Sequence, residues 1–213
     1  MQYRLDDILK RAADIVLAAV ALALSVPFWL WAMMVIGLGD GWPFLYAQTR
    51  VGRQGRVFRI YKFRSMIKHA EKHTGPVFSP KNDRRVTPVG RIMRKTAIDE
   101  IPQLINIFKG DMSWVGPRPA RPEEVAQYRR EVPRYDLRHQ VRPGLTGMAQ
   151  VYGGDYSDIG RKLAYDLQYI RQRSLLLDLR LFVRSWLNTL LGGWERARAG
   201  AQSDFGSGPM SGG

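Results

Sequence analysis

The 213-residue sequence contains no cysteine and only three histidines. Without cysteine, disulfides and thiolate metal sites are excluded. A zinc site normally needs three or four ligands, and His69 and His73 have no third ligand near them, so we interpret this pair as a solvated surface feature. Acidic residues are also scarce, with 19 against 33 basic ones and a net charge of +14. This excess favours an anionic partner: nucleic acid, an anionic bilayer surface or phosphate-bearing small molecules.

One long segment has no charge at all. No charged residue occurs from Ile15 to Leu38, a stretch long enough for a bilayer-spanning helix. Ser25 and Pro27 lie in its middle. Proline removes a backbone donor and bends a helix, and a serine can satisfy the backbone groups that such a bend frees. The segment is therefore expected to break at Ser25-Val26-Pro27.

Basic residues flank both ends of this segment: Arg4, Lys10 and Arg11 before it, and Arg50, Arg53 and Arg56 after it. Lysine and arginine near membrane segments favour the cytoplasmic side, so a simple span would put one cluster on the wrong side. A helix that enters the membrane, breaks and returns keeps both clusters inside. We predict that residues 1–40 form an N-terminal helix with a re-entrant membrane hairpin, and we favour this over a plain span or a cleaved signal peptide.

The rest of the chain predicts a helix-rich α+β domain over residues 41–192 at the cytoplasmic face. Two aromatic and β-branched runs, 44–49 and 56–63, surround a glycine-bearing loop and predict a small β-hairpin. Apolar periodicity predicts one helix over 101–108, and a charged helix is expected over 123–130.

The C-terminal part carries a last amphipathic helix. Its apolar stripe consists of Leu179, Phe182, Val183, Trp186, Leu187 and Leu190. A basic amphipathic helix with tryptophan either lies in the membrane interface or packs against the domain core, and the stripe allows both interpretations. Residues 193–213 are rich in glycine and serine and are expected to form a disordered tail.

An adjacent acid pair, Asp99-Glu100, stands out in this basic chain. One interpretation is that Asp99 caps the following helix, with Pro102 in its first turn. The other is that both carboxylates bind a divalent cation, since two carboxylates with substrate phosphate oxygens are typical of Mg²⁺. One of the pair would then attack phosphorus, because a carboxylate can act as a covalent nucleophile.

Several cations stand in segments suited to phosphate. Arg118 lies between Pro117 and Pro119, which stiffen the backbone that carries its planar fork. Lys62 and Arg64 alternate with aromatic residues, a pattern of a half-solvated strand or of an anion site. A tight turn follows Arg142, which suggests another loop that approaches phosphate.

Together these segments resemble the bacterial sugar transferase family, the small monotopic phosphoglycosyl transferases. The match extends from about Tyr3 to Leu191. The motifs that carry it are Ser25-Val26-Pro27, Gln48-Thr49-Arg50-Val51-Gly52, Tyr61-Lys62-Phe63-Arg64-Ser65-Met66, Ile98-Asp99-Glu100-Ile101-Pro102-Gln103-Leu104, the run from Gly110 to Pro119, and the run from Leu137 to Gly147.

The resemblance implies a reaction and a place for it. A sugar 1-phosphate would pass from a UDP-sugar to a polyprenol phosphate, usually undecaprenyl phosphate, with release of UMP and a requirement for Mg²⁺. Asp99 would form a covalent phosphosugar ester, and Glu100 would assist at the metal or with protons. Arg94 and Arg118 match phosphate-contacting arginines, and Lys62 falls in a basic segment near the site. The enzyme would be monotopic, on the cytoplasmic face of the bacterial inner membrane.

Two other functions are weighed against this one. A membrane-tethered basic protein would explain the charge but not the acid pair, and a scaffold of a glycan assembly complex would not need the Asp99, Glu100, Arg94 and Arg118 set. The favoured interpretation expects a UDP-sugar, polyprenol phosphate and anionic lipids as partners, and no nucleic acid. The oligomeric state is left open, with a homodimer as one expectation.

Overall fold

The structure is a computed structural model that describes residues 5–70, 83–153 and 158–190. It is rich in helices and has two small sheets, which confirms the α+β prediction. The expected tail over 193–213 lies outside the described residues. Its helices in chain order are α1 Leu5–Leu24, α2 Val26–Asp40, α3 Pro88–Lys95, α4 Gln103–Lys109, α5 Pro122–Glu131, α6 Met148–Tyr152, α7 Ile159–Gln172 and α8 Leu175–Leu190.

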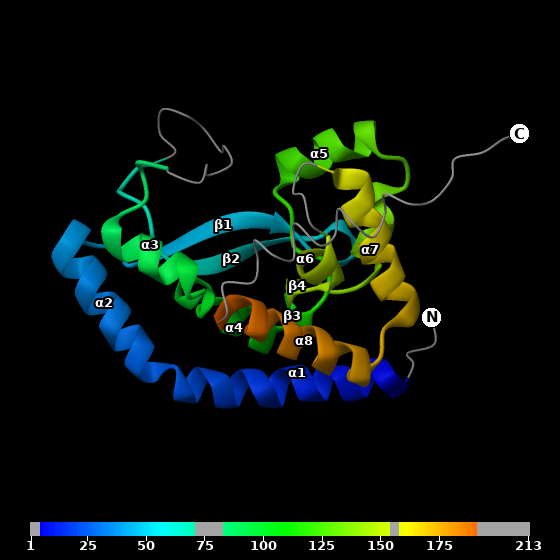
Figure 1. The fold of residues 1–213 in the computed structure, drawn as a ribbon, viewed down its shortest axis with the longest axis horizontal. Helices are drawn as coiled ribbons and strands as arrows, with labels where there is room; N and C mark the ends of the chain where they lie inside the picture. The colour runs from blue at the N-terminus through cyan, green and yellow to red at the C-terminus, as the bar shows by residue number, and fades with distance from the viewer. Residues whose placement is uncertain (1–4, 71–82, 154–157, 191–213) are drawn as a thin grey trace, which may run out of the picture.

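The predicted hairpin is confirmed, with strand bounds that differ from the predicted ones by at most two residues. Strands β1 (Leu45–Val51) and β2 (Val57–Phe63) pair antiparallel, and the short 3₁₀ turn η1 (Arg53–Gly55) connects them. Two further 3₁₀ turns, η2 (Ile98–Glu100) and η3 (Tyr135–Gln140), flank the central loops. In Figure 1 the hairpin lies above α4, with α5 and α7 beyond one of its ends.

A second sheet consists of two three-residue strands that pair in parallel, β3 (Ser113–Val115) and β4 (Gly144–Thr146). The strands approach so closely at Gly116 that a Cβ there would lie 2.4 Å from the carbonyl oxygen of Arg142. Only glycine fits such an approach. The Gly116 N–H donates to the Thr146 carbonyl at 2.9 Å, so this pairing fixes the backbone that leads into residues 117–119.

The predicted break in the apolar segment occurs where expected. α1 and α2 meet at Ser25 with a bend of 55°. The Ser25 hydroxyl donates to the Leu22 carbonyl at 2.9 Å and accepts from the Trp29 indole N–H at 3.2 Å. Among the described helices, none alone has the length and apolarity to cross a membrane, whereas α1 and α2 taken together do.

The inner face of α1 belongs to the core of the domain. Ala18 is fully buried against Ile60 of β2 and Leu104 and Ile107 of α4. Asp14, one turn earlier, is also buried. α1 therefore packs into the same core cluster as β2 and α4.

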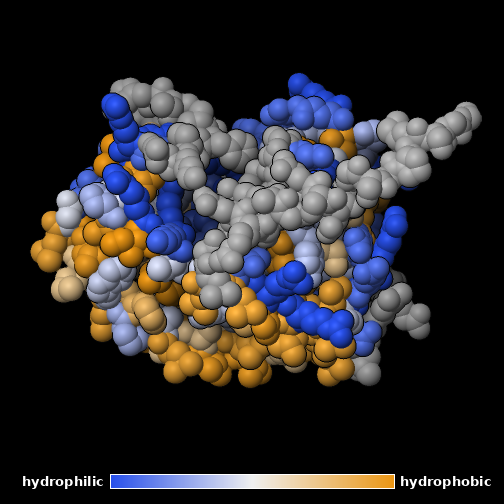
Figure 2. All heavy atoms as spheres, viewed as in Figure 1, coloured by the Kyte–Doolittle hydropathy of each residue, from blue (hydrophilic) through white to orange (hydrophobic). Residues whose placement is uncertain are grey.

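The outer faces of α1, α2 and α8 expose large apolar side chains. Examples on α1 are Leu17 and Leu24, the latter 72% exposed. On α8 the side chain of Leu181 is buried, but most of the predicted stripe is exposed: Leu179, Val183, Trp186, Leu187 and Leu190. Most of this stripe therefore does not face the core. α8 runs beside α1 in Figure 1, and Figure 2 shows orange apolar atoms gathered along this edge.

Candidate active site

The acid pair lies in a tight turn between two helices. Ala97 has φ 57°, which reverses the chain after α3, and η2 then carries Asp99 and Glu100. The N-cap of α4 is Pro102, and Asp99 makes no capping hydrogen bond to it. The interpretation of Asp99 as a helix cap is therefore wrong. The turn instead presents both carboxylates toward β2 and the loop that contains Arg118.

Glu100 is held between two cations. Lys62 Nζ lies 2.6 Å from Glu100 Oε1, and Arg118 Nη2 lies 2.9 Å from the same oxygen. Burial disfavours the ionised carboxyl, but the charges and hydrogen bonds of Lys62 and Arg118 outweigh it and hold the pKa of Glu100 well below its usual range. Glu100 is therefore a fixed carboxylate that orients two cations.

Asp99 has a different environment although it is the next residue. It is 7% exposed, and within the described chain its carboxylate takes part in no hydrogen bond or ion pair. Burial raises the pKa of Asp99 to about 6; the charge of Lys62 opposes this rise and that of Glu100 adds to it. At neutral pH the group is ionised, desolvated and without a partner. Such a carboxylate is available to react with a ligand.

Two arginines lie near the acid pair: Arg94 precedes it in the sequence, and Arg118 follows it. Arg94 is near the end of α3, a helix that begins with Thr87 as N-cap, whose hydroxyl accepts from the Gly90 N–H at 2.9 Å. Its Nε donates to the Ser65 hydroxyl at 2.8 Å, and its charge acts on Asp99. Sequence reasoning did not single out Ser65, although it follows Arg64 in the basic segment.

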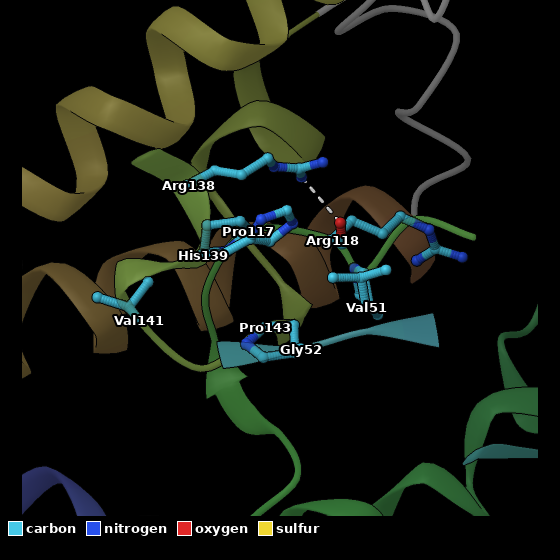
Figure 3. A pocket seen from close by; sticks show the side chains of 9 residues that line it. Val51, Gly52, Pro117, Arg118, Arg138, His139, Val141 and Pro143 are labelled. Atoms are coloured by element: carbon cyan, nitrogen blue, oxygen red, sulfur yellow. Dashed lines mark hydrogen bonds between the residues drawn. The ribbon is translucent and has the colours of Figure 1, made fainter. Parts of the chain in front are cut away.

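The segment around Arg118 borders a small hollow (Figure 3). Pro117, Pro119 and Arg118 line it from one side, and Arg138 donates to the Arg118 carbonyl oxygen at 2.8 Å. Arg138 is itself buried in an ion pair with Asp166 of α7 at 2.8 Å. The Arg118 side chain stays 46% exposed, so its backbone is fixed while its guanidinium remains accessible.

Two predicted site residues lie away from the acid pair. Arg64 is bound to the end of α2: it pairs with Asp40 at 3.1 Å and donates to the carbonyls of Gly41 and Pro43. Arg142 donates to the Gly110 carbonyl at 3.0 Å and lines a separate hollow beside α1. The structure therefore brings together Asp99, Glu100, Lys62, Arg94 and Arg118, with Pro117 and Pro119 beside them. Ser25 and Pro27 remain at the helix bend.

Metal ligands at this site are few. In the part of the chain that the structure describes, no group of three or more histidine, cysteine or acidic side chains could hold a metal. Glu100 Oε1 is shared by two cations, so among the described residues of the acid pair the second oxygen of Glu100 and both oxygens of Asp99 make no hydrogen bond or ion pair. This donor set does not fit a metal enclosed by protein ligands. It does fit Mg²⁺, which is commonly bound through one or two carboxylates, water and substrate phosphates.

The sequence profile described as bacterial sugar transferase matches residues 5–192. The chain belongs to the bacterial sugar transferase family. The match covers α1 to α8, so it includes the acid pair, the helix bend and both small sheets.

The curated relatives of this chain are named for different sugars. A UDP-N-acetylgalactosamine-undecaprenyl-phosphate N-acetylgalactosaminephosphotransferase of Aeromonas hydrophila is 45% identical over 87% of this chain and 44% of its own length. A UDP-glucose:undecaprenyl-phosphate glucose-1-phosphate transferase of Escherichia coli K12 is 40% identical over 83% of this chain and 39% of its own. The exopolysaccharide production protein PSS of Rhizobium leguminosarum is 38% identical, with 89% and 98% covered. The chain thus spans less than half the length of the first two relatives.

Proposed function

We propose that this protein transfers a sugar 1-phosphate from a UDP-sugar to undecaprenyl phosphate and releases UMP, as the membrane step that begins a polysaccharide pathway. One observation carries the proposal: Asp99 is a buried carboxylate that has no hydrogen bond or ion pair among the described residues, and it lies directly beside a carboxylate that holds two cations. The names of the relatives support the substrate classes, but they differ in the sugar, so we propose no particular one.

In the proposed mechanism Asp99 is the nucleophile. A carboxylate oxygen of Asp99 attacks the β-phosphorus of the UDP-sugar, a new O–P bond forms, and the bond from that phosphorus to the bridging oxygen breaks. UMP leaves with the bridging oxygen, and the phosphosugar remains as an ester on Asp99. A phosphate oxygen of undecaprenyl phosphate then attacks the same phosphorus, which forms the diphosphate and returns the Asp99 carboxylate.

The cations of the site suit the charge that develops in both steps. Glu100 fixes Lys62 and Arg118 at 2.6 and 2.9 Å, so their positive charges need no reorganisation when a diphosphate arrives. The Arg118 side chain is 46% exposed, and a guanidinium can bind phosphate oxygens in pairs. Arg94 adds a third positive charge near Asp99.

Mg²⁺ is proposed as the cofactor. Asp99 would hold it together with the diphosphate, and Glu100 would contribute through its second oxygen. When bound, the ion would neutralise negative charge on the diphosphate oxygens. The test is UMP release after removal of divalent ions with EDTA and after return of Mg²⁺. We expect loss and recovery; full activity in EDTA would remove Mg²⁺ from the proposal.

We further propose a monotopic arrangement on the cytoplasmic face of the bacterial inner membrane. The bend at Ser25 supports a re-entrant hairpin made of α1 and α2, and the exposed apolar residues of α1 and α8 support burial of this edge among lipids. A lipid acceptor also requires the site to lie close to the bilayer surface. Cysteine scanning of α1 and α2 with a membrane-impermeant reagent would test this: labelling of both helix ends from the same side supports it, and labelling from opposite sides contradicts it.

The reaction itself is tested with detergent-purified protein, Mg²⁺, undecaprenyl phosphate and a panel of UDP-sugars. We expect lipid-dependent UMP release with at least one sugar, and a protein adduct on Asp99 detected by mass spectrometry when the lipid is withheld. UMP release without any adduct would favour direct transfer over a covalent intermediate. A folded protein that releases no UMP from any donor would favour a scaffold role.

A further inference from the structure

A second cluster of cations lies beside α1, apart from the acid pair. It surrounds a small hollow that is partly open to solvent. We call it the α1 hollow. Its charged lining consists of Asp7, Lys10, Asp14, Arg53, Arg142 and Arg173. Neither Asp99, Glu100, Lys62 nor Arg118 lines it.

Two of the four cations in this lining are already paired. Lys10 Nζ lies 2.5 Å from Asp178, and Arg173 Nη2 lies 3.0 Å from Asp7. Asp14 accepts hydrogen bonds from the Ser113 hydroxyl at 3.1 Å and from the Trp114 N–H at 3.2 Å. Lys10, Arg173 and both carboxylates therefore have partners. The other two cations of the lining are Arg53 and Arg142.

The Arg53 side chain has no hydrogen bond or ion pair among the residues that the structure describes. Its Nε is closed off from solvent and still lacks a partner. Arg142 uses only its Nε, which donates to the Gly110 carbonyl, and its two Nη groups make no hydrogen bond within the described ranges. Two guanidinium groups therefore border the same hollow with most of their donors unused.

The charges around Arg142 oppose one another. Burial lowers the pKa of Arg142, the charges of Arg11 and Arg53 lower it further, and Asp14 and Asp7 only partly compensate. The Arg11 guanidinium is held in place, because its Nη groups donate to the Ile107 and Phe108 carbonyls at the end of α4. It therefore cannot move away from Arg142 to lower the repulsion. An anion between Arg53 and Arg142 would satisfy the unused donors and remove the repulsion between like charges.

We propose that the α1 hollow binds a phosphate-bearing anion between Arg53 and Arg142. Planar guanidinium groups bind phosphate oxygens in pairs, and two of them at one hollow suit a tetrahedral anion better than a single carboxylate. The anion has two sources, a free phosphate or the headgroup of an anionic phospholipid. The same helix that lines the hollow through Asp7, Lys10 and Asp14 also exposes Val16, Leu17 and Val20.

The test uses the full-length protein in detergent and inorganic phosphate as the probe. Because the candidate active site also attracts phosphate, titration calorimetry is done in an Arg118→Gln background. We expect one saturable binding event to remain there. Arg53→Gln should weaken this event about tenfold, the usual effect of losing a charge-assisted hydrogen-bonding pair.

Arg56→Gln is the matched control. Arg56 is exposed, lies three positions further along the same connection and carries the same charge. We expect less than a twofold change with this variant. Arg53→Gln removes no described contact, so it should fold; Arg142→Gln loses the bond to Gly110 and is the secondary variant. Hydrogen exchange gives the location: phosphate should slow exchange in residues 7–14 of the Arg118→Gln protein and leave it unchanged once Arg53→Gln is added.

The outcomes separate the proposal from its alternatives. No saturable event in the Arg118→Gln background, or equal effects of Arg53→Gln and Arg56→Gln, would overturn it. Short-chain phosphatidylglycerol below its micelle concentration then identifies the source: displacement of phosphate by this lipid and not by phosphatidylcholine assigns a lipid headgroup, and no displacement assigns free phosphate. The binding assay needs no turnover, so its result does not depend on whether the proposed reaction occurs.

Discussion

Two buried carboxylates of this protein, Asp99 and Asp166, lie near the same loop in opposite situations. Asp166 on α7 is 2% exposed and pairs with Arg138 at 2.8 Å. Asp99 is 7% exposed and has no partner within the described residues. Burial raises the pKa of both carboxyls, but only Asp166 has an arginine in direct contact.

The two carboxylates therefore differ in role: Asp166 supports the structure of the site, and Asp99 is available to react. Arg138, fixed by Asp166, donates to the carbonyl oxygen of Arg118 and so positions the backbone of the site without touching the acid pair. Asp99 has nearby positive charges but no hydrogen bond or ion pair among the described residues, which costs stability but keeps its oxygens accessible to a ligand. A fold tolerates such a group where function requires it and compensates with well-paired groups nearby. The four predictions below test this division.

The largest effect is expected for Asp99→Asn. The amide has nearly the same shape but is no nucleophile, so UMP release should fall by at least about a thousandfold. The midpoint of thermal unfolding should stay unchanged or rise, because a buried charge without a partner is removed. The assay is UMP release together with thermal unfolding in the same detergent. A variant that loses activity and also unfolds much earlier would place Asp99 among the supporting residues.

Asp166→Asn should show the opposite pattern. Removal of one member of a buried ion pair leaves Arg138 charged and unpaired, which should lower the free energy of unfolding by about 3–5 kcal/mol. Chemical denaturation followed by circular dichroism measures this. Glu123→Gln on the exposed face of α5 is the control and should change it by less than about 0.5 kcal/mol. If Asp166→Asn is as stable as the control, the paired cluster is not the support described here.

Glu100→Gln addresses the boundary between the two roles. The variant loses the charge that holds Lys62 and Arg118 in place, so UMP release should fall by about a hundredfold through kcat, a typical loss for one preorganised electrostatic contact. The phosphosugar adduct on Asp99 should still form, only more slowly. An adduct absent at all times would give Glu100 an essential part in the first step.

The smallest effect is expected for Tyr135→Phe. The Tyr135 hydroxyl accepts a buried hydrogen bond from Arg138, so its removal should cost about 1 kcal/mol in the free energy of unfolding. Tyr128→Phe is the matched control, because the two rings pack together at 5.3 Å and the Tyr128 hydroxyl makes no hydrogen bond among the described residues. Equal stability of both variants would mean that Arg138 needs only Asp166.

Local sequence signals found much of the fold. The alternating runs gave the hairpin, the apolar period gave α4, and the Ser25-Val26-Pro27 break appears at the expected position. The parallel pair β3–β4 was not predicted, because three-residue strands far apart in the chain leave no periodic pattern. α3 and α7 were also missed, although Thr87-Pro88 and Asp158 are ordinary helix-start signals.

The site was found in part for the same reason. Asp99, Glu100 and the proline-flanked Arg118 stand out as short motifs, so their chemistry is visible in the sequence. The partners of an arginine are not: Arg64 binds the end of α2 and Arg142 the end of α4 through backbone carbonyls, which every residue possesses. Arg138 was missed because its partner Asp166 lies on another helix, and no local pattern joins them.

Asp14 and Ala18 of α1 are buried among residues 104–114, which are synthesised later than α1. During synthesis α1 leaves the ribosome long before α4 and β3 exist, so its inner face must wait for them. At 5–20 residues per second, the roughly ninety residues between them take on the order of 5 to 20 seconds. During that interval the outer face of α1 is apolar and exposed, and its inner face has no residues to pack against. For the monotopic arrangement proposed above, the order of synthesis favours delivery of α1 to the bilayer before α4 and β3 have been made.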